Sequence, residues 1–268
     1  LREFDLTTRT FVAGGFDLPE GKSGIDWLDR DTLLLASPLG DGHATMSGYA
    51  RTLRLWKRGA APLESPVIFE GKAESMSVGA GLDRDTTGKI WFSERTGFFD
   101  AITWLGEAQG ARVRLDLPED AHYQWHRGWL AVKPRTPWTV GGQTYAPDTL
   151  LGIAFADFLA GKRDFQRLFV PEERRALDGF FWCGGRLVLS ILDNLRPVCE
   201  VLTPGACAWA HAEIGGLPQI GTASIGAMDV ETSETNGDLA ATIQSPVLPP
   251  SFALLQPLAA PEILKQGP

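Results

Sequence analysis

Short apolar runs separated by turn residues form the dominant pattern of the chain from end to end. Stretches rich in Leu, Ile, Val, Phe and Trp alternate with clusters of Gly, Pro, Asp and Asn, which is typical of β-strands joined by tight turns. Helical periodicity is nearly absent. The exception is AFADFLAGKRDF at residues 154–165, where DFLAG predicts one helical turn that ends at Gly161.

The strands recur in a fixed order roughly every fifty residues. A strongly apolar type occurs as DTLLLAS, GKIWFSE, GWLAVKP, GRLVLSI and GDLAATI, beginning at residues 31, 88, 128, 185 and 237. A second type occurs as RTLRLWKRG, FFDAITWLG, TLLGIAFAD, PVCEVLTPG and SFALLQPLA, beginning at residues 51, 98, 149, 197 and 251. A third type closes each unit as PVIFEG, VRLDLP, FQRLFVP, WAHAEIG and EILKQ, beginning at residues 66, 113, 165, 209 and 262. An incoming strand, such as SGIDWL or QIGTASIGAMDV, precedes the first type.

Four strands per repeated unit predict an all-β fold, a β-propeller of four-stranded antiparallel blades. A blade sheet cannot bury both of its faces until neighbouring blades stack against it, which explains why the unit repeats. A sandwich or barrel also alternates short strands, but it gives no reason for the strand order to recur five times. We therefore expect about five blades, with LREFDLTTRTFVAGG at residues 1–15 as the last two strands of a preceding blade.

An alternative is a free-standing propeller that binds a protein or ligand and is complete with five blades. It predicts that LREFDL and TFVAGG pair with the final strands and close the ring as a split blade. In either case the ending SPVLPPSFALLQPLAAPEILKQGP, residues 245–268, contains the last two strands of the fifth unit. We expect VLPP to be the loop that leads into them, because proline cannot donate to a strand ladder.

Several long segments resemble the propeller domain of bacterial prolyl oligopeptidase-like serine peptidases. They are REFDLTTRTFVAGGFDLPEGKSGIDWLDRDTLLLASPLG, SGYARTLRLWKRG, WTVGGQTYAPDTLLGIAFADFLAGKRDFQRLF and SPVLPPSFALLQPLAAPEILKQ, in the same order along nearly the whole chain. In that family a seven-bladed propeller is inserted ahead of an α/β-hydrolase domain. The resemblance implies that residues 1–268 are a single but incomplete propeller domain that starts late in the second blade and stops where the catalytic domain begins.

The resemblance also implies a function for the parent enzyme. That enzyme would hydrolyse short peptides after proline through a Ser, Asp, His triad, and the propeller would cover the active site and admit only oligopeptides. The partners implied for this chain are the α/β-hydrolase catalytic domain of the same parent chain and the oligopeptide substrate. This chain alone would be inactive, and no cofactor or metal is expected.

Composition and charge limit which other classes of binding partner the chain is expected to have. The 268 residues are 44% hydrophobic and 22% charged, with a net charge of −8 and no Lys/Arg cluster longer than a dipeptide. This acidic balance argues against nucleic acid or an anionic membrane as a partner. No apolar stretch is long enough to span a bilayer, and the compartment, cytoplasmic or periplasmic, stays open. Cys199 and Cys207 flank a turn-like TPGA, so they are either a disulfide across a hairpin or free thiols.

A catalytic serine is not predicted within these residues. The nearest string to the G-x-S-x-G nucleophile elbow is GTASIG at residues 221–226, where Thr222 replaces the first glycine of the motif around Ser224. The following residues indicate a strand, an acidic turn and another strand, whereas the elbow requires a helix. We therefore interpret Ser224 as an ordinary residue of a blade strand.

The histidines and carboxylates do not indicate a metal site. His122 and His126 are four residues apart, but a strand would spread them over roughly 13 Å, and no third ligand follows nearby. His43 lies in the Gly-rich stretch GDGHATMSG, which we expect to be a connector over one propeller face. The acidic clusters GLDRDTTG and LPEDA, which contain Asp83, Asp85, Glu119 and Asp120, are explained by hairpin turns.

One segment indicates a substrate-facing position. SERTGFFDAITW, residues 93–104, resembles a family stretch in which a propeller Arg, followed three residues later by a small or apolar side chain, lines the outer substrate pocket. The corresponding residues here are Arg95 and Phe98. Because Phe98 is bulkier than the Cys found there in prolyl oligopeptidases, the resemblance implies a narrower or differently aligned pocket. The other interpretation is a turn Arg beside a core Phe.

Overall fold

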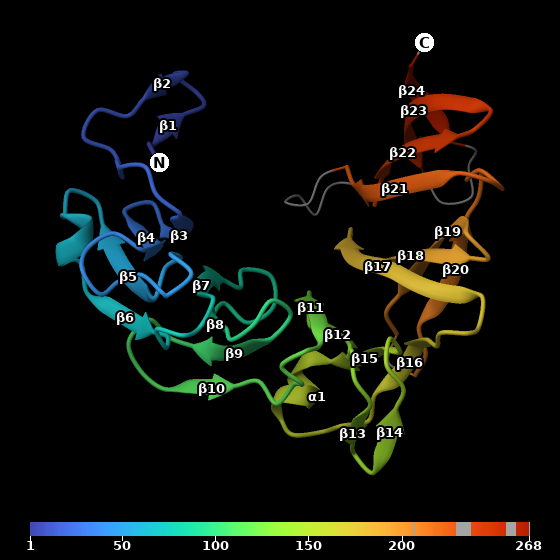
Figure 1. The fold of residues 1–268 in the computed structure, drawn as a ribbon, viewed down its shortest axis with the longest axis horizontal. Coiled ribbons are helices and arrows are strands. Elements are labelled where there is room, and N and C mark those ends of the chain that lie inside the picture. Colours follow the sequence, from blue (N-terminus) through green and yellow to red (C-terminus); the bar gives the residue numbers. More distant parts are fainter. Residues whose placement is uncertain (206, 229–236, 256–260, 268) are drawn as a thin grey trace. The chain divides into compact units, whose positions relative to one another are not determined.

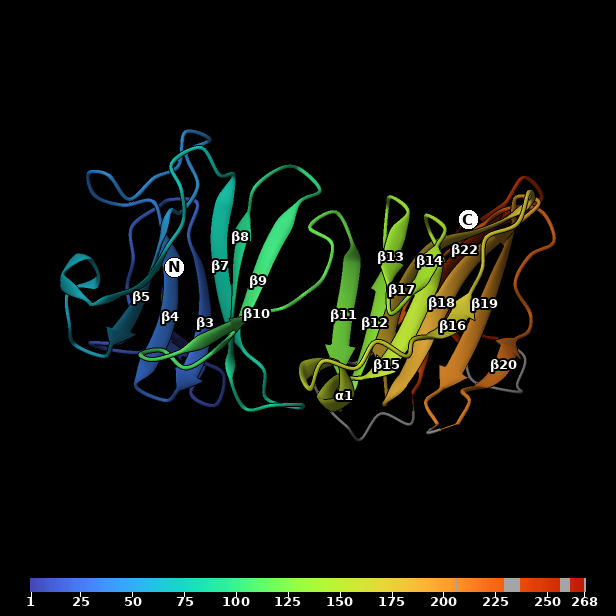
Figure 2. The same ribbon diagram turned by 90° about the horizontal axis from the view of Figure 1, so that it is seen from below.

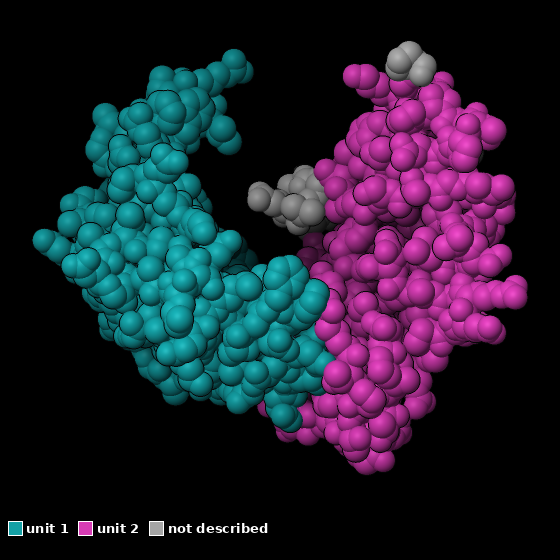
Figure 3. Space-filling model, in the orientation of Figure 1, with its two compact units in different colours: residues 1–121 teal, residues 122–268 magenta. Residues whose placement is uncertain are grey.

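The chain is described by a computed structural model that covers all residues except 206, 229–236, 256–260 and 268 (Figure 1). It divides into two compact units, Leu1–Ala121 and His122–Pro268 (Figure 3). The prediction that residues 1–268 form one propeller domain stays a prediction. No helix in the described part is both long enough and apolar enough to cross a membrane.

Unit 1 contains a short hairpin and two four-stranded antiparallel sheets. The hairpin consists of β1 (Phe4–Asp5) and β2 (Thr10–Phe11). The first sheet consists of β3 (Gly24–Asp29), β4 (Thr32–Ser37), β5 (Thr52–Lys57) and β6 (Val67–Glu70), with the 3-10 turn Pro62–Glu64 before β6. The second consists of β7 (Ser77–Leu82), β8 (Ile90–Arg95), β9 (Ala101–Gly106) and β10 (Arg112–Arg114).

Unit 2 contains three further sheets of four strands. The first consists of β11 (His122–His126), β12 (Trp129–Lys133), β15 (Leu150–Ala154) and β16 (Gln166–Phe169), with the hairpin β13 (Trp138–Val140) and β14 (Gln143–Tyr145) and the helix α1 (Phe155–Leu159) in its connections. The second consists of β17 (Arg175–Cys183), β18 (Arg186–Asp193), β19 (Arg196–Thr203) and β20 (Ala210–Ile214). The third consists of β21 (Thr222–Ala227), β22 (Leu239–Ser245), β23 (Leu248–Leu255) and β24 (Glu262–Gln266).

These sheets confirm the predicted fold class. Each predicted unit is one sheet whose four blade strands are hydrogen-bonded in chain order, from the incoming strand to the closing strand. The five sheets of the described chain, with the two-stranded hairpin ahead of them, are the expected blades of a partial β-propeller (Figures 1 and 2). In the described strands β1 pairs with β2, and the last sheet consists of β21 to β24. The alternative of a free-standing propeller closed by a split blade stays a prediction.

The apolar side chains of the blade sheets are buried because both faces of a sheet are covered by neighbouring elements. In unit 1, Leu34 and Leu53 on one face of the first sheet pack against Phe92 of the second, and all three are almost completely buried. The opposite face of the first sheet is covered by Phe16 and Leu18, which precede β3. In unit 2, equivalent clusters lie between the first and second sheets and between the second and third. The apolar alternation of the strands is therefore used on both faces, as a blade requires.

The predicted helical turn is confirmed as α1. Phe155 and Phe158 are its buried residues, and the Gly161 amide donates to the Phe158 carbonyl oxygen at 3.0 Å. Gly161 has φ +89°, a conformation that favours glycine and ends the turn.

Two local features differ from the sequence prediction. The hairpin β13–β14 inside the third blade was not predicted, because its strands are short and lie outside the repeated order. Pro249 and Pro250 were expected in a loop, but both lie in β23. The pairing of β22 with β23 shifts register between Ile243 and Ser245, so the ladder is irregular where the prolines lack amide donors.

The cysteines are free thiols. Cys199 is fully buried in β19, and Cys207 is exposed, so the disulfide alternative is wrong in this structure. Burial raises the pKa of the Cys199 thiol to about 12. A thiol with so high a pKa is neutral at physiological pH and chemically inert.

Candidate substrate-facing loop

Arg95 and Phe98 lie together in the tight connection between β8 and β9. Arg95 is the last residue of β8, and Ala101 opens β9 directly opposite it. The amides of Thr96 and Gly97 both donate to the Asp100 carbonyl oxygen, at 3.0 and 3.3 Å. A Cβ atom at Gly97 would come within 2.6 Å of the Asp100 carboxylate, so this turn is closed around a glycine.

The Arg95 side chain folds back over the connection. Its guanidinium donates from Nη2 to the Phe98 carbonyl oxygen at 2.6 Å, which links the two predicted residues directly. Arg95 is exposed, and no carboxylate of the described residues forms an ion pair with it. Its remaining N–H groups are therefore available to an acceptor on a ligand.

Phe98 is on the surface, contrary to the interpretation that it is a core residue. Its side chain is 68% exposed, and Phe99 beside it is 54% exposed. The two rings contact each other edge to face, with centroids 4.7 Å apart. An exposed aromatic pair next to a guanidinium with N–H groups left over can bind a ligand that has both an apolar part and a carbonyl or carboxylate group.

A buried carboxylate anchors this connection. Glu94, only 7% exposed, accepts hydrogen bonds from the Lys72 amide at 2.8 Å and the Ser75 hydroxyl at 2.6 Å. The Met76 amide then donates to the Arg95 carbonyl oxygen at 2.7 Å. Sequence reasoning missed Glu94, although a carboxylate inside the apolar run GKIWFSE was a signal for a buried polar anchor.

The Gly-rich connector between β4 and β5 lies beside this anchor. The Thr45 hydroxyl donates to the Met76 carbonyl oxygen at 3.0 Å, and the Met46 amide donates to the Ala73 carbonyl oxygen at 2.8 Å. Met46 is 82% exposed, and Tyr49 lines a pocket of about 430 Å³ between β3 and β7. Figure 2 shows this connector and the β8–β9 connection at the same end of the unit 1 strands.

His43 holds the same connector in place. Arg54 is 7% exposed, and its Nη2 lies 3.1 Å from His43 Nε2. A guanidinium only donates, so Nε2 accepts and the proton of a neutral His43 is on Nδ1. His43 Nδ1 is buried and has no hydrogen-bond partner in the described part of the chain. The residue thus belongs to a connector at one end of the blades, as its sequence context predicts.

Ser224 lies in β21 opposite Thr242 of β22. It has the expected position of an ordinary strand residue, because the motif lies within a strand that continues to Ala227, whereas a nucleophile elbow turns from strand into helix.

His122 and His126 both lie in β11, where their rings contact Phe180 and Trp182 of the neighbouring sheet at centroid distances of 4.6 and 5.7 Å. Burial, together with the charges of Lys133 and Arg135, lowers the pKa of His122. Both imidazoles therefore belong to packing between sheets.

The predicted turn carboxylates have local partners. Asp83 accepts from the amide and hydroxyl of Thr87 at 3.0 and 2.6 Å, and Glu119 pairs with Arg114 at 2.9 Å. Asp85 accepts from the Thr86 hydroxyl at 2.8 Å. Within the described residues, no three His, Cys, Asp or Glu side chains are grouped as metal ligands.

The four-stranded antiparallel sheets define a propeller module. Its candidate functional residues lie in a connection between strands. The comparisons with known proteins specify its kind. No family model matches the chain. It is 30% identical over 250 residues to the uncharacterized peptidase y4nA of Sinorhizobium fredii (strain NBRC 101917 / NGR234), covering 87% of this chain and 34% of that protein.

Solved structures show the same fold. A post-proline cleaving enzyme from Rickettsia typhi superimposes with a TM-score of 0.85 at 23% identity, over 99% of this chain and 40% of that one. A structure from a study of two prolyl endopeptidases matches with a TM-score of 0.66 at 15% identity, over 98% of this chain and 38% of that one. These matches confirm the resemblance to the propeller of prolyl oligopeptidase-like peptidases. The chain spans about a third of the length of the curated relatives it matches.

Proposed function

We propose that this chain is the substrate-gating propeller of a prolyl oligopeptidase-like serine endopeptidase that hydrolyses short peptides after proline. The observation that supports this most directly is the match of 99% of the chain, at a TM-score of 0.85, to part of a post-proline cleaving enzyme. More than half of that enzyme lies outside the matched region, which leaves room for a catalytic domain. The partners of the chain are then an α/β-hydrolase domain of the same parent protein and the oligopeptide substrate.

The division of labour follows from the chemistry of acyl transfer. A serine peptidase needs a hydroxyl nucleophile, an imidazole general base and a carboxylate that orients the base. We assign these groups to the catalytic domain and none of them to this chain. The propeller contributes by covering the active site, excluding folded proteins and admitting chains thin enough to pass.

In this proposal Arg95 and Phe98 contact the outer part of the substrate. The remaining N–H groups of the Arg95 guanidinium would bind a backbone carbonyl or the carboxylate of the peptide, and the Phe98 ring would pack on an apolar side chain. Neither group takes part in the bond-breaking step. Both therefore act on substrate binding and on the preferred peptide length.

A labelling experiment tests the proposed function. The full-length parent protein and the 268-residue chain are each incubated with a chromogenic Gly-Pro substrate and with a serine-directed fluorophosphonate. We expect cleavage and covalent labelling of the parent and neither for the chain. Labelling of any residue of the chain, or a parent that does not cleave after proline, would contradict the proposal.

Substitution of Arg95 tests the substrate-facing role. In the full-length enzyme we expect Arg95→Ala to raise KM for longer peptides about three- to tenfold with kcat unchanged, because one solvent-exposed hydrogen bond to the peptide, worth about 1 kcal/mol, is lost. Arg30→Ala, in the β3–β4 turn at the other end of its blade, is the matched control. If Arg95→Ala has the same kinetics as the wild type, Arg95 does not contact the substrate and is an ordinary turn residue.

A further inference from the structure

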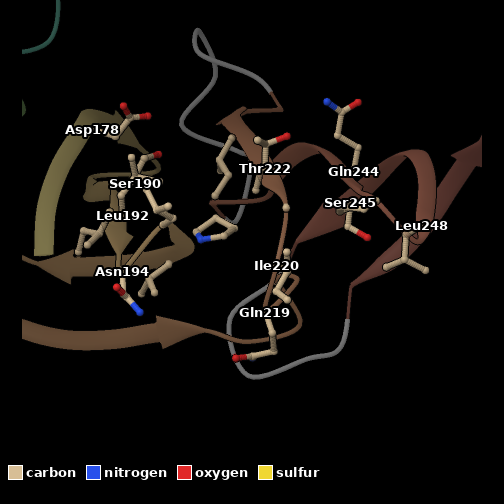
Figure 4. A pocket seen from close by; sticks show the side chains of 18 of the residues that line it. Asp178, Ser190, Leu192, Asn194, Gln219, Ile220, Thr222, Gln244, Ser245 and Leu248 are labelled. Carbon is tan, nitrogen blue, oxygen red and sulfur yellow. The ribbon is translucent and has the colours of Figure 1, made fainter. Parts of the chain in front are cut away.

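Unit 2 contains a pocket of about 900 Å³ that the proposed gating role does not use (Figure 4). One wall consists of residues from β17, β18 and the start of β19, and the other of residues from β21, β22 and the β22–β23 turn. Figure 4 shows Asp178, Ser190 and Leu192 on the first wall and Thr222, Gln244 and Leu248 on the second. Its volume is in the range of small-ligand and peptide sites.

The chemistry of the walls excludes several ligand classes. Among the described residues, no Lys, Arg or His lines the pocket. The guanidinium of Arg196, which donates to the lining residue Gln219 at 3.4 Å, also pairs with Asp193 at 4.0 Å, so it is already engaged. The described lining also contains no aromatic ring for a sugar or a nucleobase to stack on. Asp178, the one acidic side chain of the described lining, is too little for a divalent cation that needs several oxygen ligands.

The groups that are present suit a peptide. Aliphatic side chains and prolines form most of the surface, and the side-chain amides of Asn194, Gln219 and Gln244 are spaced among them. The Gln219 oxygen accepts from Arg196 at 3.4 Å, which leaves its NH₂ group to donate. A primary amide both donates and accepts, as a peptide group does, so these side chains can pair with a peptide backbone. In the described part of the chain β21 pairs with β22 alone, and an extended segment can add to a strand edge of this kind through backbone hydrogen bonds.

The rim of the pocket carries two exposed apolar side chains that add nothing to the buried core of the unit. Leu195 and Ile220 are 82% and 75% exposed. Asn194 and Leu195 form the two-residue β18–β19 turn with φ +51° and +69°, where the second position normally favours glycine. A leucine there is strained in its backbone and exposed to water, which destabilises the isolated unit on both grounds.

We propose that this pocket binds an extended oligopeptide segment that is rich in aliphatic residues and free of acidic side chains. Leu195 and Ile220 cover the bound segment at the rim, the amides pair with its backbone, and Asp178 favours a ligand with a positive amino terminus. The choice of a peptide in trans rests on the proposed function, since an oligopeptidase handles such ligands.

Fluorescence anisotropy on the 268-residue chain tests this site without any catalytic step. The probe is a ten-residue peptide of Leu, Ala, Gly and Pro with a free amino terminus and a carboxy-terminal fluorescein, and its matched partner has two Leu replaced by Glu. We expect saturable binding of the first peptide and at least tenfold weaker binding of the second. Non-saturable binding, or equal binding of the two peptides, would overturn the proposal.

The variants separate the pocket from the rest of the surface. Leu195→Gly removes the rim side chain and relieves the turn, so it should fold at least as stably as the wild type and bind the apolar peptide about tenfold more weakly. Ile220→Asn should weaken binding similarly. Leu159→Asn, at an exposed position of α1 outside the pocket, should leave it unchanged. Wild-type affinity in both rim variants would overturn the site.

The full-length parent gives a second outcome. If the parent cleaves after proline but does not bind the probe that the chain binds, a segment of the parent itself occupies the pocket and the proposal of a peptide in trans is wrong. If the chain binds the probe but the parent does not cleave after proline, the peptide pocket is supported and the proposed function is refuted. The two proposals can therefore fail separately.

Discussion

Phe16→Ala should lower the free energy of unfolding of unit 1 by more than a substitution in the exposed N-terminal hairpin does. Phe16 is only 6% exposed and covers the outer face of the first blade sheet, where its ring lies 4.8 Å from Trp56 and 5.5 Å from Trp27. An aromatic side chain of this kind buries about 150–250 Å², which corresponds to about 4–6 kcal/mol at 25 cal/mol per Å² as an upper bound. We expect a loss of about 3–5 kcal/mol, the usual range for a buried Phe changed to Ala.

Urea denaturation followed by tryptophan fluorescence measures this loss, because Trp27 and Trp56 contact the Phe16 ring directly. Phe11→Ala is the matched control, since Phe11 is 54% exposed and should cost less than about 1.5 kcal/mol. If Phe16→Ala costs no more than Phe11→Ala, the segment before β3 does not act as the cover of the first blade and the reasoning is wrong.

Three further predictions concern the charged groups and thiols. Hydrogen bonds from Arg58 lower the pKa of Glu3, so the stabilisation from this pair is complete above the ordinary glutamate pKa of about 4.3 and is lost as the pH falls through the lowered value. Glu3→Gln should therefore cost about 1 kcal/mol at pH 7 and almost nothing at pH 2, measured by urea denaturation at both pH values; an equal loss at both would contradict the ion pair. Glu94→Ala should cost about 2–3 kcal/mol because the buried Ser75 hydroxyl and the half-buried Lys72 amide lose their acceptor, and thermal unfolding in which Glu94→Gln is as damaging as Glu94→Ala would refute its role as an acceptor. In native protein at pH 8, a thiol reagent should modify exposed Cys207 within minutes and leave buried Cys199 intact, as peptide mass analysis can show; rapid modification of Cys199 would mean that β19 opens.

The blades were predictable from the sequence because each blade strand has to present apolar side chains to a neighbour. Runs such as DTLLLAS and GRLVLSI became β4 and β18, whose central residues are almost completely buried on both faces. This requirement repeats with every blade, so the order of strand types is visible in a single chain. The connections are under no such requirement, since they need only join strands at the ends of a sheet.

The functional side chains lie in those connections, which explains why the site was only partly predictable. The sequence led to Arg95 and Phe98 through a short resemblance, but it did not distinguish a buried Phe98 from one that is 68% exposed. Exposure there depends on the turn closed at Gly97 and on the carboxylate of Glu94, which is adjacent to Arg95 in sequence but acts on residues about twenty positions earlier. Such a long-range contact produces no repeating pattern of residues, so it cannot be recognised in a single sequence.

The strained turn at Leu195 illustrates how a site can be found once the fold is known. A leucine in a sequence such as LDNLRP looks like one more apolar residue of a strand, and only the backbone shows that it occupies a left-handed position with its side chain in water. Selection for stability alone would favour glycine there, because glycine adopts this conformation without strain. A residue that works against both backbone preference and solvation requires another reason to be present, and contact with a ligand supplies it. In this repeat protein the positions that depart from the requirements of the blade are therefore the ones to test for function.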